Sequence, residues 1–142
     1  FDLLDFAVIG IHSSFKGGSE KQTKRVLLAL GHPKVKIFAH PTSRRLDRRE
    51  ELDLDWEKIL EICKDRGIWL EVNSSPDRLD LPDVLVREAI KIGLRLVINT
   101  DAHTLSSMRF MEYGVSVARR GWAKRGDIIN TMPYEEFVKE VI

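Results

Sequence analysis

Four side chains of types that commonly bind divalent metal ions follow apolar, strand-like segments of this 142-residue chain. They are His12, His40, Asp101 and His103. Neutral imidazole and carboxylate groups together suit Zn²⁺, Mn²⁺ or iron in mixed nitrogen and oxygen coordination. The Asp101-x-His103 spacing lets two ligands leave one extended turn and reach the same ion or adjacent ions. These residue types point to a metal site, provided that the fold brings them together.

Short apolar, β-rich segments alternate with helical patterns along most of the chain. The segments expected as strands are 6–11, 35–39, 68–72 and 94–99, and those expected as helices are 19–30, 55–66, 81–92, 105–113, 115–120 and 134–142. This order predicts an α/β fold in which parallel strands are joined by helical crossovers. The strand ends fall about 30 residues apart, as in repeated βα units. That spacing leaves a barrel segment and an open doubly wound sheet as alternatives.

The carboxyl ends of parallel strands meet at one edge of a sheet, and the sites of βα folds are built there. A single histidine after a strand is more often a structural hydrogen-bonding group than a ligand. Three of the four histidines nevertheless share this position, so we expect them at one rim with Asp101. The fourth, His32 in Gly31-His32-Pro33, is expected to be a turn residue at the end of a helix, where the helix dipole favours it.

Three further residues are candidates for contact with a substrate. Arg44 follows the second strand, and its planar guanidinium suits a phosphate oxygen, although a surface arginine is an equal alternative. Lys16, four residues after His12, is a weaker phosphate candidate. Asn73 could orient a ligand or contact substrate, and Glu71 is expected to point to the same side of that strand. Either side chain could instead satisfy backbone groups.

The composition excludes several other classes of protein. With 23 basic and 22 acidic residues, the chain is not expected to be a general polyanion binder. Two basic clusters, within residues 44–49 and 119–125, are interpreted either as solvated surface or as nucleic-acid contacts. The apolar stretches are too short for a membrane span. The single cysteine, Cys63, is expected in the core; it allows no intrachain disulfide, which favours a reducing, cytoplasmic location.

The three tryptophans, Trp56, Trp69 and Trp122, are most simply packing residues. Trp122 stands beside Arg119, Arg120 and Arg125, so stacking on a nucleic-acid base is its alternative role. No Ser-His-Asp triad, phosphate-binding glycine loop or paired-cysteine zinc motif is evident in the sequence. The chain starts at Phe1 and runs directly into an apolar segment, so we expect it to be part of a longer protein.

Several motifs resemble those of the PHP (polymerase and histidinol phosphatase) domain. They are Ile11-His12-Ser13, Ala39-His40-Pro41-Thr42-Ser43-Arg44, Leu70-Glu71-Val72-Asn73 and Asn99-Thr100-Asp101-Ala102-His103. The family usually has Gly where this chain has Ser43. The segments Gly114-Val115 and Ala118-Arg119-Arg120-Gly121-Trp122 are similar to the C-terminal part of bacterial and archaeal family X DNA polymerases, where this domain follows the polymerase.

The resemblance implies a distorted seven-stranded βα barrel, a TIM-like fold, in which residues 1–142 form the C-terminal portion of a single PHP domain. It implies that His12, His40, Asp101 and His103 are catalytic metal ligands, in a cluster of up to three Mn²⁺ or Zn²⁺ ions at the carboxyl rim. The family's opening His-x-His motif, a further His and a bridging Glu have no counterpart in this sequence. The segment alone is therefore expected to bind metal poorly and to be inactive.

The implied activity is metal-dependent phosphodiester hydrolysis at DNA 3′ ends, of the 3′–5′ exonuclease type that serves DNA repair. The implied partners are DNA, the N-terminal part of the domain and an upstream polymerase domain, with no membrane. Two alternatives remain open. One is a phosphatase for a small metabolite, of the histidinol-phosphatase type, and the other is a non-catalytic PHP remnant that stabilises a polymerase or binds DNA.

Overall fold

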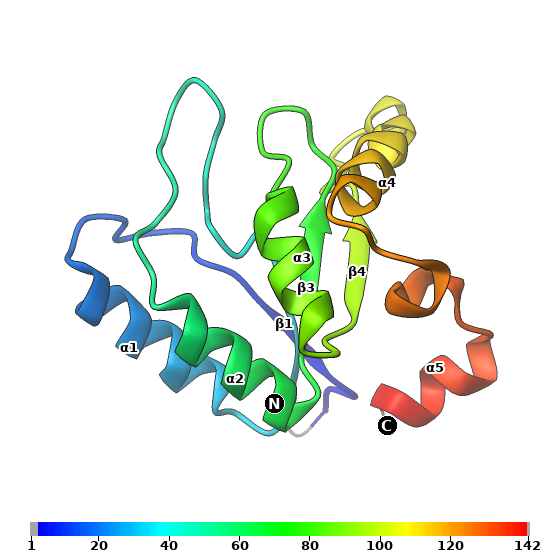
Figure 1. The fold of residues 1–142 in the computed structure, drawn as a ribbon, viewed down its shortest axis with the longest axis horizontal. Helices are drawn as coiled ribbons and strands as arrows, with labels where there is room; N and C mark the ends of the chain where they lie inside the picture. The colour runs from blue at the N-terminus through cyan, green and yellow to red at the C-terminus, as the bar shows by residue number, and fades with distance from the viewer. Residues whose placement is uncertain (1–2, 142) are drawn as a thin grey trace.

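Parallel strands alternate with helices in the computed structural model, which describes residues 3–141 (Figure 1). The elements are β1 (Ala7–Ile9), α1 (Ser19–Leu30), β2 (Val35–Phe38), α2 (Trp56–Arg66), β3 (Trp69–Asn73), α3 (Asp83–Lys91), β4 (Leu96–Asn99), α4 (Met111–Arg120) and α5 (Tyr134–Val141), with short 3₁₀ helices η1 (Leu105–Phe110), η2 (Arg125–Asp127) and η3 (Ile129–Thr131). The α/β prediction is confirmed. None of the helices within the described range combines the length and apolar character that a bilayer crossing requires.

The strands stand side by side in the order of the sequence, β1-β2-β3-β4, and every pair is parallel. All carboxyl ends therefore lie at the same edge of the sheet, which we call the carboxyl edge. The strand order does not reverse, unlike that of a doubly wound sheet. Beyond β4, Leu96 forms a parallel bridge with Ile128, and the Asn130 side chain bonds the backbone of Ile98 at 2.7 and 2.9 Å.

The two faces of the sheet have different partners. Helices α1 to α4 pack with Leu70 and Val72 in the main core. Because successive side chains of a strand alternate in direction, Trp69 faces the opposite side, where a smaller cluster holds α5 and η3. Glu71 and Asn73 point to the same side of the sheet as Trp69. Cys63 is fully buried in the main core, and its burial raises its pKa to about 12, so the thiol is a packing group.

The predicted helix boundaries hold where capping signals are present. Asp55 precedes α2 and its side chain accepts a hydrogen bond from the Lys58 N–H at 3.2 Å, as expected of an N-cap. Gly67 ends the same helix with φ 61°, a left-handed conformation that glycine adopts without strain. The last predicted helix begins at Tyr134 as observed, while its predicted end, Ile142, lies outside the described residues.

The predicted division into helices 105–113 and 115–120 is wrong. A 3₁₀ helix covers Leu105–Phe110, and one continuous α-helix runs from Met111 to Arg120 through Gly114. Gly114 does not break the helix; it lets α4 approach the sheet. A Cβ at this position would lie 2.0 Å from Ser74 Oγ and 2.6 Å from Ile98 Cγ2. The glycine therefore reflects close packing, which sequence pattern alone does not separate from a turn signal.

Gly114→Ala should lower the free energy of unfolding by about 2 kcal/mol, because α4 must move away from Ser74 and Ile98 to accept the methyl group. Gly126→Ala is the matched control, since a Cβ there meets nothing within 4 Å. Urea denaturation followed by circular dichroism measures both. Equal stability of the two variants would show that the α4–sheet contact tolerates the extra atom.

Candidate metal site

His12 and His40 meet at the carboxyl edge although 27 residues separate them in the chain. His12 follows β1 and His40 follows β2, and these strands are neighbours. Their imidazole rings lie 4.9 Å apart between centroids, at an interplanar angle of 85°. The neighbouring ends of β1 and β2 thus bring two of the predicted metal ligands together.

The space between the two rings depends on Gly10. A Cβ there would lie 3.0 Å from His40 Nε2 and 3.2 Å from His12 Nε2. Both Nε2 atoms therefore border one small space that any side chain at residue 10 would fill. His40 is 5% exposed, and its Nδ1 is buried without a hydrogen-bond partner. Burial, and then the positive charges of Arg78 and His12, lower the pKa of His40 to about 4.

Asp101 lies close enough to His40 to act on it electrostatically, since its charge opposes the lowering of the His40 pKa. The carboxylate makes an ion pair with Arg78, with 3.3 Å between Oδ2 and Nε. His103 is exposed, and its Nδ1 lies 2.7 Å from the Asp101 carbonyl oxygen. A carbonyl oxygen only accepts, so Nδ1 is the donor in this contact. His12, His40 and Asp101 thus share one neighbourhood, with His103 on the same loop as Asp101.

These residues fit a divalent metal ion in part. His40 is neutral at physiological pH, which is the form that binds a metal, and the Gly10 space receives two imidazole nitrogens. A full cage is not assembled, because no group of three His, Cys, Asp or Glu side chains within residues 3–141 is arranged to hold an ion. The described residues therefore bring two imidazole nitrogens together without completing a metal site.

Glu71 fixes the backbone around these ligands. Its Oε2 accepts hydrogen bonds from the His40 N–H at 2.7 Å and from Asn73 Nδ2 at 3.2 Å, and its Oε1 accepts one from Asn99 Nδ2 at 2.8 Å. One buried carboxylate thereby ties together the ends of β2, β3 and β4. Asn73 lies as expected on the same side as Glu71, and its Oδ1 accepts from the Ser75 N–H at 3.1 Å. Its role as a substrate contact stays a prediction.

The loops of the carboxyl edge are tied to one another through buried polar groups. Asp80, in the loop after β3, accepts a hydrogen bond from the Thr42 N–H at 3.0 Å. Ser43 donates from Oγ to the Ile11 carbonyl at 3.0 Å and has φ 54°. That left-handed conformation favours glycine, which is the residue that the family resemblance implies at this position. Ser43 offsets the strain with a hydrogen bond that glycine cannot make.

Arg44 is held by the protein itself. Its Nε donates to the Arg78 carbonyl at 2.8 Å, Nη2 donates to the Leu79 carbonyl, and Nη1 pairs with Glu51 at 2.8 Å. This anchors the loop after β3, and the Arg44–phosphate contact stays a prediction. Lys16 lies exposed between β1 and α1. It too remains a candidate.

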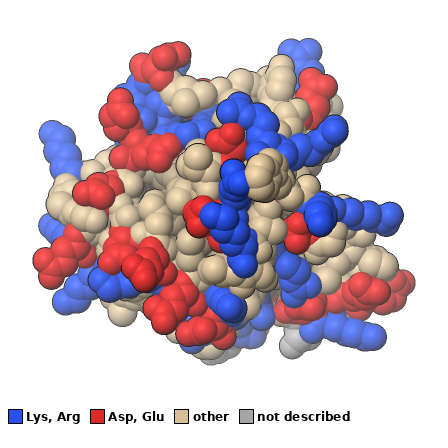
Figure 2. Space-filling model, in the orientation of Figure 1, with Lys and Arg blue, Asp and Glu red and all other residues tan. Residues whose placement is uncertain are grey.

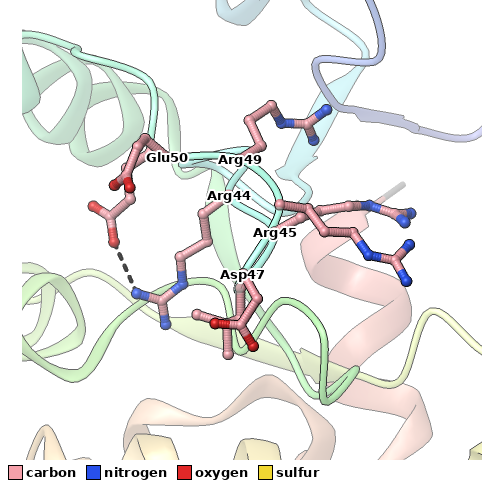
Figure 3. A pocket seen from close by; sticks show the side chains of 8 residues that line it. Arg44, Arg45, Asp47, Arg49 and Glu50 are labelled. Carbon is pink, nitrogen blue, oxygen red and sulfur yellow. Dashed lines mark hydrogen bonds and ion pairs between the residues drawn. The ribbon is translucent and has the colours of Figure 1, made fainter.

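The first basic cluster does not converge on a single site. Residues 44–51 enclose a pocket of about 590 Å³ with no histidine in its wall. Figure 3 shows the arginines Arg44, Arg45 and Arg49 pointing in different directions around it. Arg49 donates to the Ser43 carbonyl at 2.8 Å and its guanidinium covers the Phe15 ring at 3.7 Å. Arg44, Arg45 and Arg49 thus make contacts within the protein, and several of these contacts reach neighbouring loops.

Sequence reasoning missed Arg78. Its side chain is 9% exposed, and the one ion pair that it makes among the described residues is with Asp101. Both Nε and Nη1 are buried without hydrogen-bond partners. Burying a cation with unused donors is costly unless an anion satisfies it. In the sequence, Arg78 belongs to the turn-rich segment 74–80, and only the fold places it near His40 and Asp101.

Comparison with known proteins identifies relatives over most of this chain, although no protein-family model matches it. The DNA polymerase/3′-5′ exonuclease PolX of Bacillus subtilis (strain 168) is 37% identical over 127 residues, which are 89% of this chain and 22% of PolX. A probable phosphatase of Thermoanaerobacter sp. (strain X514) is 24% identical over 96% of this chain and 58% of its own length. A probable phosphatase of Caldanaerobacter subterraneus subsp. tengcongensis is 26% identical over 70% of this chain.

The chain is homologous to PolX and to PHP-type phosphatases. The resemblance inferred from the motifs is thereby confirmed. The chain spans about a fifth of PolX and about three fifths of the Thermoanaerobacter phosphatase. The exonuclease and phosphatase activities for which these homologues are named are both forms of phosphoester hydrolysis.

Gly10→Ala should disturb both histidines, because the new Cβ would stand 2.6 Å from His40 Cε1. We expect the free energy of unfolding to fall by about 2 kcal/mol and the His12 and His40 imidazole NMR signals to shift. Gly18→Ala, where a Cβ meets nothing within 4 Å, is the control. Unchanged imidazole signals in the Gly10 variant would contradict the proximity of the two rings.

Asp80→Asn should change the pH dependence of stability. Burial raises the pKa of Asp80 from 3.8 to about 7, against the lowering effect of its Thr42 bonds. Because the pKa of Asp80 is higher in the folded than in the unfolded protein, its protonated side chain contributes fully to the free energy of unfolding below about pH 4. That contribution is lost as the pH rises through 7. The free energy of unfolding of the variant should therefore rise by up to about 4 kcal/mol relative to that of the wild type between pH 4 and pH 8.

Urea denaturation across this pH range measures the difference between variant and wild type. That difference isolates Asp80 from His40, whose lowered pKa acts in the same range with the opposite sign. Asp53→Asn, at an exposed position, is the control and should show a flat difference. A flat difference for Asp80→Asn as well would mean that this carboxyl titrates normally.

Proposed function

We propose that this chain is the C-terminal portion of a PHP domain and forms part of a metal-dependent phosphoesterase that hydrolyses phosphodiesters at DNA 3′ ends. The observation that carries the proposal is the meeting of His12 and His40 over Gly10, beside Asp101 and Arg78. The homology to PolX over 89% of the chain supports this activity over others.

In this proposal, His12, His40, Asp101 and His103 hold Mn²⁺ or Zn²⁺, and further ligands come from the remainder of the domain. A divalent ion so held supplies an acidified water and neutralises phosphate charge. The chain's own groups then have separate tasks. Neutral His40 offers a lone pair without competition from protons, and Glu71 holds its backbone in place.

Arg78 is the residue best placed to contact the substrate phosphate. It is fixed by the contacts of Arg44 with the Arg78 and Leu79 carbonyls. Its Nε and Nη1 donors are buried next to Asp101 without hydrogen-bond partners, and a phosphate oxygen that entered beside Asp101 would satisfy them. The guanidinium would offset the charge that develops on the phosphoryl group, which is worth most in a site with little water.

A small-metabolite phosphatase is the second candidate, because two probable phosphatases are 24% and 26% identical to the chain. The PolX homologue has the higher identity, 37%, which favours DNA as substrate. A non-catalytic role is the third alternative. The metal content of the full-length protein distinguishes it from the two enzymatic roles.

The test is shortening of a 5′-labelled single-stranded oligonucleotide by the full-length protein with Mn²⁺. We expect stepwise 3′–5′ shortening that chelation abolishes. His12→Gln should lower the rate at least a hundredfold, since this exposed side chain can be replaced without opening the core. His32→Gln, at the end of α1, is the matched control and should keep wild-type activity. Arg78→Gln should mainly raise KM.

Three results would overturn the proposal in different ways. Absence of shortening together with absence of bound metal would establish the structural role. Faster turnover of histidinol phosphate than of DNA would establish the phosphatase. Equal DNA cleavage by wild type and His12→Gln would remove the histidine pair from the chemistry.

A further inference from the structure

Trp122 lies outside the candidate metal site and is 65% exposed, an unusual position for the largest apolar side chain. It follows α4 directly, in the second basic cluster of the sequence. The Arg87 guanidinium from α3 lies 3.3 Å from the centroid of its ring. One face of the indole is therefore covered by a cation, while much of the side chain is open to solvent.

The backbone holds this indole in place at the expense of conformational strain. Trp122 has φ 70°, a left-handed conformation that favours glycine. The glycine at the end of α4 is Gly121, one residue before Trp122. Close packing requires it there, because a Cβ at Gly121 would lie 2.3 Å from Val86 Cγ1. Helix α4 ends through the Trp122 N–H to Arg119 carbonyl bond of 2.9 Å. Core packing does not explain a tryptophan here, since the ring is not buried.

A shallow hollow of about 290 Å³ lies beside the ring, and its walls include the side chains of Arg87, Lys91, Lys124 and Asp127. Arg87 Nε is buried there without a hydrogen-bond partner. The hollow thus combines an aromatic plane, an underused guanidinium and two lysines. These are the groups that protein surfaces use to stack a nucleobase and to hold the adjoining phosphates.

The surrounding charge is positive. The cations are Arg87, Lys91, Arg119, Arg120, Lys124 and Arg125, and the neighbouring acids are Asp83, Glu88 and Asp127. Two acids are engaged in ion pairs, Glu88 with Lys91 and Asp83 with Arg120, and Asp127 accepts from the Lys124 N–H. Figure 2 shows Lys and Arg side chains over α3, next to uncharged surface where the chain leaves α4.

This surface connects to the carboxyl edge. The Arg120–Asp83 ion pair of 2.8 Å joins the end of α4 to the start of α3. Asp83 follows closely after Arg78 and Asp80, which belong to the edge described above. A strand leaving the carboxyl edge along the start of α3 would meet the Arg120 side chain first and the Trp122 ring next.

We propose that Trp122, Arg87 and the flanking lysines form a second binding surface that stacks a base of single-stranded DNA outside the candidate metal site. The choice of single-stranded DNA rests on the proposed function; the stacking chemistry rests on the exposed ring. A duplex does not offer the unstacked base that this surface requires.

The test is fluorescence anisotropy of labelled (dT)20 with the full-length protein in EDTA, so that binding is measured without hydrolysis. Trp122→Ala should weaken binding about tenfold, as expected for one stacked base. Trp122→Phe should recover part of the loss. Tyr134→Ala removes another exposed aromatic ring, 74% exposed at the start of α5, and is the matched control that should bind as wild type does.

Two measurements keep the outcome decisive. Lys124→Gln should reduce the slope of log affinity against log salt by about one, whereas Lys64→Gln on α2 should not. Photocrosslinking of 5-iodouracil DNA to the wild-type protein should label the peptide that contains Trp122. Equal affinity of Trp122→Ala and Tyr134→Ala, or crosslinks confined to other peptides, would overturn the inference.

Failure of this inference is distinguishable from failure of the proposed function. With p-nitrophenyl thymidine phosphate, which is too short to reach the surface, Trp122→Ala should keep the wild-type kcat/KM. With the oligonucleotide its KM should rise while kcat stays unchanged. Hydrolysis without a Trp122 effect would retain the phosphoesterase and remove the second surface, whereas binding without hydrolysis would do the reverse.

Discussion

A single buried carboxylate organises the carboxyl edge of this sheet. Glu71 receives donors from His40, Asn73 and Asn99, which follow or end three adjacent strands. A buried carboxylate costs a large desolvation free energy unless hydrogen bonds replace its water. The three donors supply that replacement, and they do so only in the register that pairs Asn73 with Asn99. Strand register and ligand position are therefore specified by the same interaction.

The backbone conformation at the strand ends also depends on contacts with neighbouring residues. His40 and Asp101 both have positive φ, 34° and 53°, although neither is glycine. Such conformations cost roughly 1–2 kcal/mol per residue and persist where neighbouring contacts enforce them. For His40 the enforcing contact is the bond from its N–H to Glu71. The side chain is consequently directed toward His12 rather than along the strand.

Sequence reasoning could place His12, His40, Asp101 and His103 at one edge because strand ends depend on local signals: apolar β-rich runs, helix caps and glycine stops. Those signals predict alternating strands and helices, and the structure has this alternation. They could not reveal Gly10 as the space for two imidazoles or Gly114 as a packing contact, because both functions are defined by residues distant in sequence. Arg78 and Asp80 were missed for the same reason. Their environment is created by Thr42, Arg44 and Asp101, which only the fold assembles.

The distribution of charge is consistent with the proposed binding of single-stranded DNA, although the net charge of the chain is only +1. The first arginine cluster is largely consumed internally, since Arg44 binds carbonyls and Arg49 braces Ser43 and Phe15. The second cluster is less constrained, and its Arg120 side chain is 74% exposed even while paired with Asp83. An exposed ion pair contributes little to stability, so a phosphate can replace Asp83 as the partner of Arg120 at small cost. Surface charge that folding does not require is available for binding, and the proposed DNA contact uses the part of it that lies beside Trp122.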